Sequence, residues 1–331
     1  MEILGVLVTL LAPFDNHIAN GGEKLLGNAS SIKRRPDGKV YISGQMQRHV
    51  LFSAIDRLNM TDPDRGKTFV SNGDGVTNLI EIDIRADMGG FMHPSKGDYS
   101  GRRTAPISVT PAVAIEESEI GRDLLIRIQN NVKGNEVYSD GYILRDSDAE
   151  KEAMDSVGVN AKQALATKEF SEHDLMHMNF FLDISSLSIS KAFSYKGSFN
   201  IGTTFFKHAT DEERLRRAKL FLEATRSMND YASQARNAVS GEPQTVLIVF
   251  DTILSRKASR FFVADKQERE NILKELDDRN AKYFYGDDRT ENSVSDAYKK
   301  ALEFLLDPEN TLYDPSNGAE VMKFKDVFGN E

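Results

Sequence analysis

Residues 3–13 form an almost unbroken apolar run, ILGVLVTLLAP, directly after Met1 and Glu2. A helix needs about 20 apolar residues to cross a bilayer, so this run is too short for a membrane span. It also lacks the basic flank of a signal peptide, because Glu2 precedes it. The composition is typical of a strand that is buried on both faces. We therefore expect the first core strand of a sheet here, and no membrane partner.

The elements that follow indicate the fold class. Apolar residues recur at helical spacing in 44–59 and in 211–231, where Asp211 is the predicted N-cap. Strand patterns occupy 107–115, 124–128, 177–185 and 245–250. Strand, helix, strand, strand, helix, strand is the order of the ferredoxin-like fold that RNA-recognition domains share. We predict an α+β protein with a modified ferredoxin-like (RNA-recognition-motif-like) core, although a fold alone assigns no function.

Long polar or glycine-rich segments interrupt this core. Residues 60–105 hold a predicted strand over 79–84 among glycine-rich stretches that suit a functional loop. Residues 130–176 are polar and hold a predicted helix over 148–167, and two acidic helices are expected near 266–281 and 293–306. The chain thus divides into six parts: 1–59, 60–105, 106–129, 130–176, 177–264 and 265–331.

Charge is distributed unevenly along the chain. The formal net charge is -9, yet residues 20–50 carry a local balance of +4 and residues 265–331 one of -7. Such asymmetry is a reason to expect a polyanionic partner for the basic segment. A solvated loop with several lysines is the commoner origin of a basic run, and this alternative stays open on charge alone.

Several enzyme classes lack their sequence signatures here. The chain has no cysteine, which removes thiol nucleophiles and thiolate metal sites and favours a reducing, cytoplasmic compartment. No phosphate-binding loop, dinucleotide fingerprint or nucleophile elbow occurs. We therefore expect no catalytic residue, no metal and no cofactor.

The segment from residue 28 to 49 has the chemistry of a phosphate clamp. Three consecutive cations, Lys33, Arg34 and Arg35, lie in a loop just before the predicted helix. Ser43 and Gln45 lie at the start of that helix, where free backbone N–H groups and the helix dipole favour phosphate. Such groups hold a nucleic-acid backbone without reading its bases.

Five blocks of the sequence, in this order, resemble a known protein family. They are SSIKRR at 30–35, YISGQMQRH at 41–49, RTAPISVTP at 103–111, FFLDI at 180–184 and QARN at 234–237. Together they resemble the CRISPR-associated DevR-like branch of the Cas-seven superfamily, the backbone subunits of type I Cascade effector complexes. The resemblance covers about the first 250 residues in scattered blocks.

The resemblance implies a non-catalytic subunit of which several copies bind head to tail along one CRISPR RNA. Other Cascade subunits and target DNA, reached through the guide, are the further implied partners. A palm of 1–59, 106–129 and 177–264 would hold the RNA backbone, with fingers at 60–105, a thumb-like insertion at 130–176 and acidic helices at 265–331. Phe170 would be a thumb wedge. The implied RNA-binding residues are Asn28, Ser31, Lys33, Arg34, Arg35, Ser43, Gln45, Arg48, His49, Arg102, Arg103, Phe170, Gln234 and Arg236.

Two alternatives stay open. Related subunits of other complexes cut RNA with an aspartate where this chain has Asn28, and an amide cannot replace a metal-binding carboxylate. A metal-dependent RNA-processing enzyme on the same fold would need other carboxylates, such as Asp74, Asp87 or Asp98. A structural oligomer that assembles without RNA is the other alternative.

Overall fold

The computed structural model describes residues 1–25, 29–73, 77–94, 100–129, 136–137, 143–144 and 162–328. The strands are β1 Glu2–Ile3, β2 Gly5–His17, β3 Glu23–Lys24, β4 Ala29–Ser31, β5 Tyr41–Ile42, β6 Phe91–Pro94, β7 Ser100–Arg103, β8 Ile107–Val109, β9 Ala112–Ala114, β10 Ile120–Gln129, β11 Glu136–Val137, β12 Ile143–Leu144, β13 Lys162–Asp183, β14 Ile189–Lys196, β15 Phe199–Lys207, β16 Thr245–Asp251, β17 Lys282–Asp287 and β18 Thr311–Leu312. The helices are α1 Gly44–Thr61, α2 Ile84–Gly89, α4 Asp211–Ala224, α5 Lys266–Asp278, α6 Val294–Leu306 and α7 Phe324–Phe328, with short 3₁₀ turns η1 Ile184–Ser186 and η2 Lys257–Arg260. The protein is of the mixed α+β class, as predicted.

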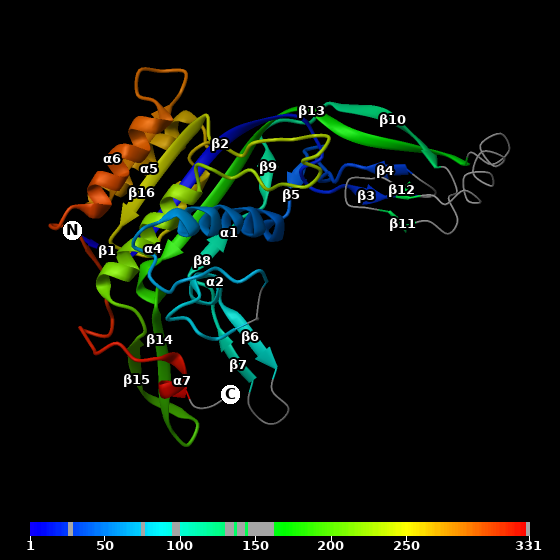
Figure 1. The fold of residues 1–331 in the computed structure, drawn as a ribbon. Coiled ribbons are helices and arrows are strands. Elements are labelled where there is room, and N and C mark those ends of the chain that lie inside the picture. The colour runs from blue at the N-terminus through cyan, green and yellow to red at the C-terminus, as the bar shows by residue number, and fades with distance from the viewer. Residues whose placement is uncertain are drawn as a thin grey trace.

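One large sheet organises the molecule (Figure 1). Its central strands lie in the order β17, β16, β2, β13, and β8 and β9 pair with the other edge of β13. These neighbours are all antiparallel. Helix α1 lies in the chain between β2 and β8, and α4 lies between β13 and β16. The sheet therefore joins segments from both ends of the sequence.

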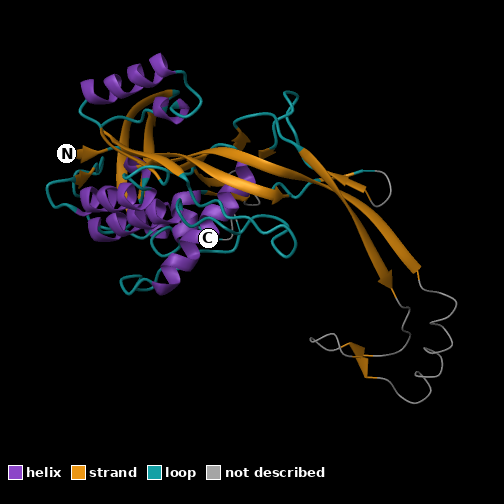
Figure 2. Ribbon diagram, turned by 90° about the horizontal axis from the view of Figure 1, so that it is seen from above, coloured by secondary structure: helices purple, strands orange, loops and turns teal. Residues whose placement is uncertain are grey.

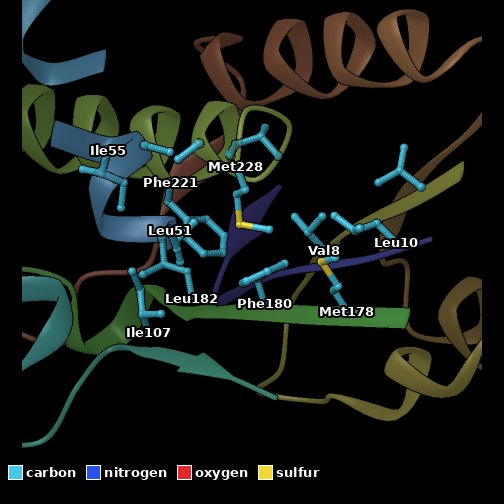
Figure 3. Packing of buried hydrophobic residues seen from close by; sticks show 14 of the residues in the cluster. Val8, Leu10, Leu51, Ile55, Ile107, Met178, Phe180, Leu182, Phe221 and Met228 are labelled. Atoms are coloured by element: carbon cyan, nitrogen blue, oxygen red, sulfur yellow. The ribbon is translucent and has the colours of Figure 1, made fainter. Parts of the chain in front are cut away.

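The first strand is buried on both faces, as its apolar run predicts. Val6, Val8 and Leu10 point into a core that α1, α4 and α6 cover, and Figure 3 shows several of these contacts. Leu7 and Leu11 point into a second core, which α5 and η2 cover. Side chains alternate across a strand, so an uninterrupted apolar run is what a sheet with two covered faces requires.

β13 is longer than any strand predicted from the sequence. Its inner half pairs with β2 from Ser171 to Asp183, and its outer half pairs with β10 along residues 162–171. The outer pair forms a ribbon that extends away from the body (Figure 2). The predicted boundary between 176 and 177 falls inside this one continuous strand. The helix predicted over 148–167 is wrong for 162–167, where pairing with β10 overrides local preference, and 148–161 lies outside the described residues.

Other predicted elements are confirmed with adjusted ends. Helix α1 and strand β16 lie where the sequence predicts them, and α5 and α6 match the two acidic helices. The cap of α4 is Thr210 rather than Asp211: the Thr210 hydroxyl accepts from the Glu213 N–H at 3.3 Å. The predicted 107–115 strand is two, β8 and β9, because Pro111 has no N–H to continue the ladder.

The segment 79–84 is not the strand predicted from its apolar residues. It forms a turn, and the Asp83 side chain then caps α2 by accepting from the Arg85 N–H at 2.9 Å. The hairpin β14–β15 was not predicted at all; it forms a two-stranded sheet of its own and projects beside α7 (Figure 1). Its strands alternate large apolar and polar residues, so the signal is present in the sequence.

Candidate nucleic-acid interface

The start of α1 is an exposed helix N-terminus close to β8 and β9. Ser43 is its N-cap, and the Ser43 hydroxyl accepts from the Met46 N–H at 3.2 Å. The first turn contains no acidic residue, and the Gln45 side chain is exposed. Hence the positive end of this helix dipole faces solvent without a carboxylate to neutralise it. This is the local geometry that the sequence predicts for phosphate binding.

Asn20 holds the basic segment against the start of α1. Its buried side-chain amide donates to the Lys33 carbonyl at 3.0 Å and to the Tyr41 carbonyl at 3.1 Å. Both backbones are thereby fixed on either side of the turn at Pro36–Gly38. Arg34 and Arg35 remain exposed: about half of the Arg35 side chain is accessible, and its only neighbouring acid among the described residues is Asp37, 3.8 Å away.

The loop 226–243 contacts α1 through two side chains, Tyr231 and Asp230. The buried Tyr231 hydroxyl donates to the Gln47 side-chain oxygen at 3.1 Å, and burial raises the pKa of this phenol well above its ordinary value. Two residues after Gln47, His49 lies 3.3 Å from the Asp230 carboxylate. The loop that carries Gln234 and Arg236 is thus fixed to the helix. Arg236 is exposed, and the Gln234 side chain donates to the Val239 carbonyl at 3.4 Å.

Strand pairing adds two cations that the sequence analysis missed. Arg122 on β10 donates to the Glu169 carboxylate at 3.0 and 3.2 Å, and Arg34 lies 3.9 Å from the same carboxylate. Lys168, beside it on β13, donates to the Ser233 hydroxyl at 3.4 Å. Lys168 is also the register partner of Ser30, next to Ser31 on β4. Only the β10–β13 and β4–β13 registers bring these residues together.

We define the basic region as the exposed or half-buried polar groups that these contacts bring to one end of the molecule. It consists of Ser31, Lys33, Arg34, Arg35, Ser43, Gln45, Arg122, Lys168, Gln234 and Arg236. Four separate chain segments contribute to it, and Glu169 is the buried acid at its centre. The six cations outnumber the acids beside them, which are Glu169, Asp37 next to Arg35 and Asp123 opposite Lys168, so the region is positive although the chain as a whole is acidic.

Two other predicted arginines serve different contacts. Arg48 donates to the Gly89 carbonyl at 2.6 Å and lies over the Phe52 ring, so it ties α1 to α2. Arg103 is 7% exposed and forms an ion pair with Asp87 at 2.5 Å. It also donates to the Ser186 and Ile189 carbonyls at 2.7 and 2.9 Å. Neither guanidinium faces the basic region.

The remaining predicted residues also lie away from it or cannot be placed. Arg102 is exposed on β7. The Phe170 ring packs across Gly121 on the facing strand, so closely that any side chain at position 121 would clash with the ring. The ring is therefore half-buried against its own ribbon. Asn28 lies outside the described residues.

Of the three carboxylates considered for metal chemistry, two lie outside the described residues and one is buried. Asp74 and Asp98 lie outside the described residues. Asp87 is fully buried between Arg103 and Arg217; burial would raise its pKa, but the two guanidinium groups outweigh burial and lower it. No group of three potential metal ligands occurs among the residues that the structure describes. The Asp87 oxygens are thus occupied by cationic donors and by Ser188.

The chain was compared with solved structures and with curated proteins. None of the described helices has the length and apolar character needed to cross a membrane. Two solved structures align with the chain at low similarity. A chain described as a CRISPR RNA-guided surveillance complex is 13% identical, with a TM-score of 0.45, and the alignment covers 88% of this chain and 92% of that one. A chain described as a pre-nicking CRISPR RNA-guided surveillance complex is 12% identical, with a TM-score of 0.42, and the alignment covers 94% of this chain and 96% of that one. No curated protein matches the sequence.

The family comparison is decisive. The model that describes the CRISPR-associated negative auto-regulator DevR/Csa2 matches residues 21–240, which is more than half of the chain. The matched range contains the basic segment, α1, the whole of β13 and the loop with Gln234 and Arg236. The chain therefore belongs to the CRISPR-associated DevR/Csa2 family.

Proposed function

We propose that this protein is a non-catalytic, guide-RNA-binding backbone subunit of a type I CRISPR surveillance complex. The observation that carries the proposal is the basic region, which the fold assembles from four chain segments at the N-terminus of α1. Membership of a CRISPR-associated family agrees with it.

The basic region binds backbone rather than bases. Lys33, Arg34 and Arg35 attract phosphates of any sequence, and the free N–H groups after Ser43 donate to a phosphate oxygen at the positive end of α1. Gln234 and Arg236 lie on the loop that Tyr231 and Asp230 hold against α1, and they add polar contacts for the same backbone. Binding by phosphate neutralisation releases counterions and is therefore steeply salt-dependent. A guide held extended in this way has already lost part of the entropy that pairing with target DNA would otherwise cost.

The arrangement of the core supports this proposal. The order β16, β2, β13, β8, with α1 and α4 as the two connections on one face, is the strand order of a ferredoxin-like sheet. We assign the palm of the subunit to this sheet. RNA-recognition domains use the same core, so the basic region lies at one end of a fold that can carry RNA.

Charge complementarity supports assembly of several copies and contact with other subunits of the complex. The C-terminal part, 265–331, has a balance of -7. Its exposed acids include Asp277 and Asp278 on α5 and Asp288, Glu291, Asp307 and Glu309 in the segments that flank α6. Helices α5 and α6 lie at the end of the sheet opposite the β10–β13 ribbon (Figure 1). The basic region lies at the base of that ribbon. Opposite charges at the two ends favour head-to-tail contact along one RNA. We place such a complex in the cytoplasm.

The experiment is fluorescence anisotropy of purified, nuclease-treated protein with labelled single-stranded RNA over a salt series, with duplex DNA as a control. The variant Lys33→Ala/Arg34→Ala/Arg35→Ala removes three phosphate contacts. The slope of log K against log salt is negative, and it should become shallower by about 2 in this variant. The matched control, Lys266→Ala/Lys299→Ala/Lys300→Ala, removes three exposed cations from α5 and α6 and should leave the slope unchanged.

Three outcomes contradict the proposal. An equal slope for the wild type and the basic-segment variant would mean that these cations do not contact phosphate. Cleavage of the RNA on addition of a divalent metal would favour the processing enzyme instead. Assembly that survives nuclease treatment, with no RNA affinity at low salt, would favour the structural oligomer.

A further inference from the structure

A second polar and aromatic site lies far from the basic region, where two ribbons project from the same side of the body. These are β6–β7 and β14–β15, with α7 beside them (Figure 1). Between them is a cavity of about 710 Å³, lined by β7, the end of β13, both strands of the hairpin and α7. Its volume is within the range of roughly 300–1,000 Å³ that is typical of sites for small organic groups.

Aromatic rings form one wall of this cavity. Phe193 and Phe205 come from the two strands of the hairpin, and Phe324 and Phe328 come from α7. The Phe193 side chain is 46% exposed, which is unusual for a ring that lines a concave surface. The Lys191 ammonium lies 5.6 Å from the centre of that ring. An accessible ring with a cation beside it is suited to stack on a flat aromatic ligand.

The charges of the cavity are graded from its rim to its floor. Arg102 and Lys191 are exposed cations at the rim. The floor holds Asp183, whose two carboxylate oxygens accept from the Ser185 and Ser186 hydroxyls at 2.6 and 2.7 Å. The nearly buried Arg103 guanidinium, also part of the lining, donates to the Ser190 hydroxyl at 3.4 Å. The Asp183 carboxylate only accepts hydrogen bonds, so it attracts an N–H donor of a ligand, whereas the exposed cations at the rim attract a phosphate.

From this gradient we infer that the cavity takes one unstacked nucleobase of a single-stranded nucleic acid. The base stacks on Phe193, its donor edge faces Asp183, and the flanking phosphates lie at the rim against Arg102 and Lys191. Guanine fits best, because its Watson–Crick edge presents adjacent N–H donors to one carboxylate. The inference rests on the proposed function, since it needs a bound single strand, but it assigns base contact to a place outside the basic region.

The test uses short single-stranded RNAs that carry 6-thioguanosine at successive positions. After irradiation, cross-linked peptides are identified by mass spectrometry. We expect cross-links within residues 189–207 for at least one position of the label. Phe193→Ala should lower the yield there about fivefold or more, the effect of losing one stacked base. Phe199→Ala is the matched control, since this ring is 77% exposed on the same hairpin but does not line the cavity.

Each outcome has a distinct meaning. Intact RNA binding with cross-links confined to 29–49 and 228–241 would overturn the cavity site and leave the proposed function standing. Equal losses for Phe193→Ala and Phe199→Ala would also overturn it, because the hairpin would then act as a general apolar surface for RNA or for a peptide. An absence of RNA binding would refute the proposed function, and the cavity site with it. Asp183→Asn adds a second check: it should reduce the preference for guanine over uracil at the cross-linked position.

Discussion

Replacing Asp87 separates a structural carboxylate from a metal ligand. Its two oxygens accept from Arg103 at 2.5 Å, from Arg217 at 2.7 Å, and from the backbone and hydroxyl of Ser188 at 2.9 and 2.7 Å. The Asp87 and Arg217 side chains are fully buried, and Arg103 is nearly so. The carboxylate is therefore the counter-charge of two guanidinium groups that water does not reach.

The size of the effect follows from that burial. Removing one partner of a buried ion pair leaves an uncompensated charge and costs about 3–5 kcal/mol. A typical domain is stable by only about 5–15 kcal/mol, so Asp87→Ala should lose roughly a fifth or more of the total. Asp87→Asn should also destabilise the fold strongly, because its amide N–H groups would face the guanidinium donors.

Denaturant unfolding followed by circular dichroism measures the loss. The control is Asp123→Ala, an exposed carboxylate on β10, which should change the free energy of unfolding by less than about 0.5 kcal/mol. A loss below about 1 kcal/mol for Asp87→Ala would refute the buried-pair account. A variant that keeps its fold but loses a metal-dependent cleavage activity would instead place Asp87 in a catalytic site.

Three further predictions follow from single contacts. Ser43→Ala removes the α1 cap and should cost about 1 kcal/mol of unfolding free energy, measured by the same denaturation. Phe170→Ala should leave RNA affinity unchanged in anisotropy, because the ring packs on Gly121; a loss of about 1–3 kcal/mol would show that it stacks on a base. Burial lowers the pKa of His177 from 6.5 to about 4, so the unfolded chain binds a proton that the folded one excludes. Stability should therefore fall as the pH drops from 6.5 to about 4, by up to about 3 kcal/mol. Denaturation at each pH measures the free energy of unfolding, which should depend less on pH in His177→Gln than in the wild type. An unchanged pH profile in this variant would contradict the assignment of the stability loss to His177.

Local sequence patterns were sufficient to predict those elements whose structure depends mainly on their own residues. The apolar run of β2, the helical spacing of α1 and the three cations at 33–35 are all visible in the sequence, and each lies where it was expected. Burial of β2 on both faces was implied by the lack of any polar alternation. The expectation of a phosphate site at the start of α1 came from Ser43 and Gln45 at the N-terminus of the predicted helix.

Tertiary contacts decided the rest. Arg48 and Arg103 look like free cations in the sequence, but carbonyls of residues 41 to 86 positions away in the chain take their N–H groups. Arg122 and Lys168 enter the basic region only through the β10–β13 register, which no local signal gives. Phe170 stands among polar neighbours, and only the strand pairing reveals Gly121 beneath its ring. Long-range pairing is what single-sequence patterns do not specify.

The most direct test of the central claim is a cryo-electron microscopy structure of the protein assembled on a synthetic guide RNA. The account predicts successive copies in a regular array, with the RNA backbone in contact with Lys33, Arg34, Arg35 and the N-terminus of α1 in each. An array in which the RNA lies elsewhere on the protein, or one that forms without RNA, would contradict it.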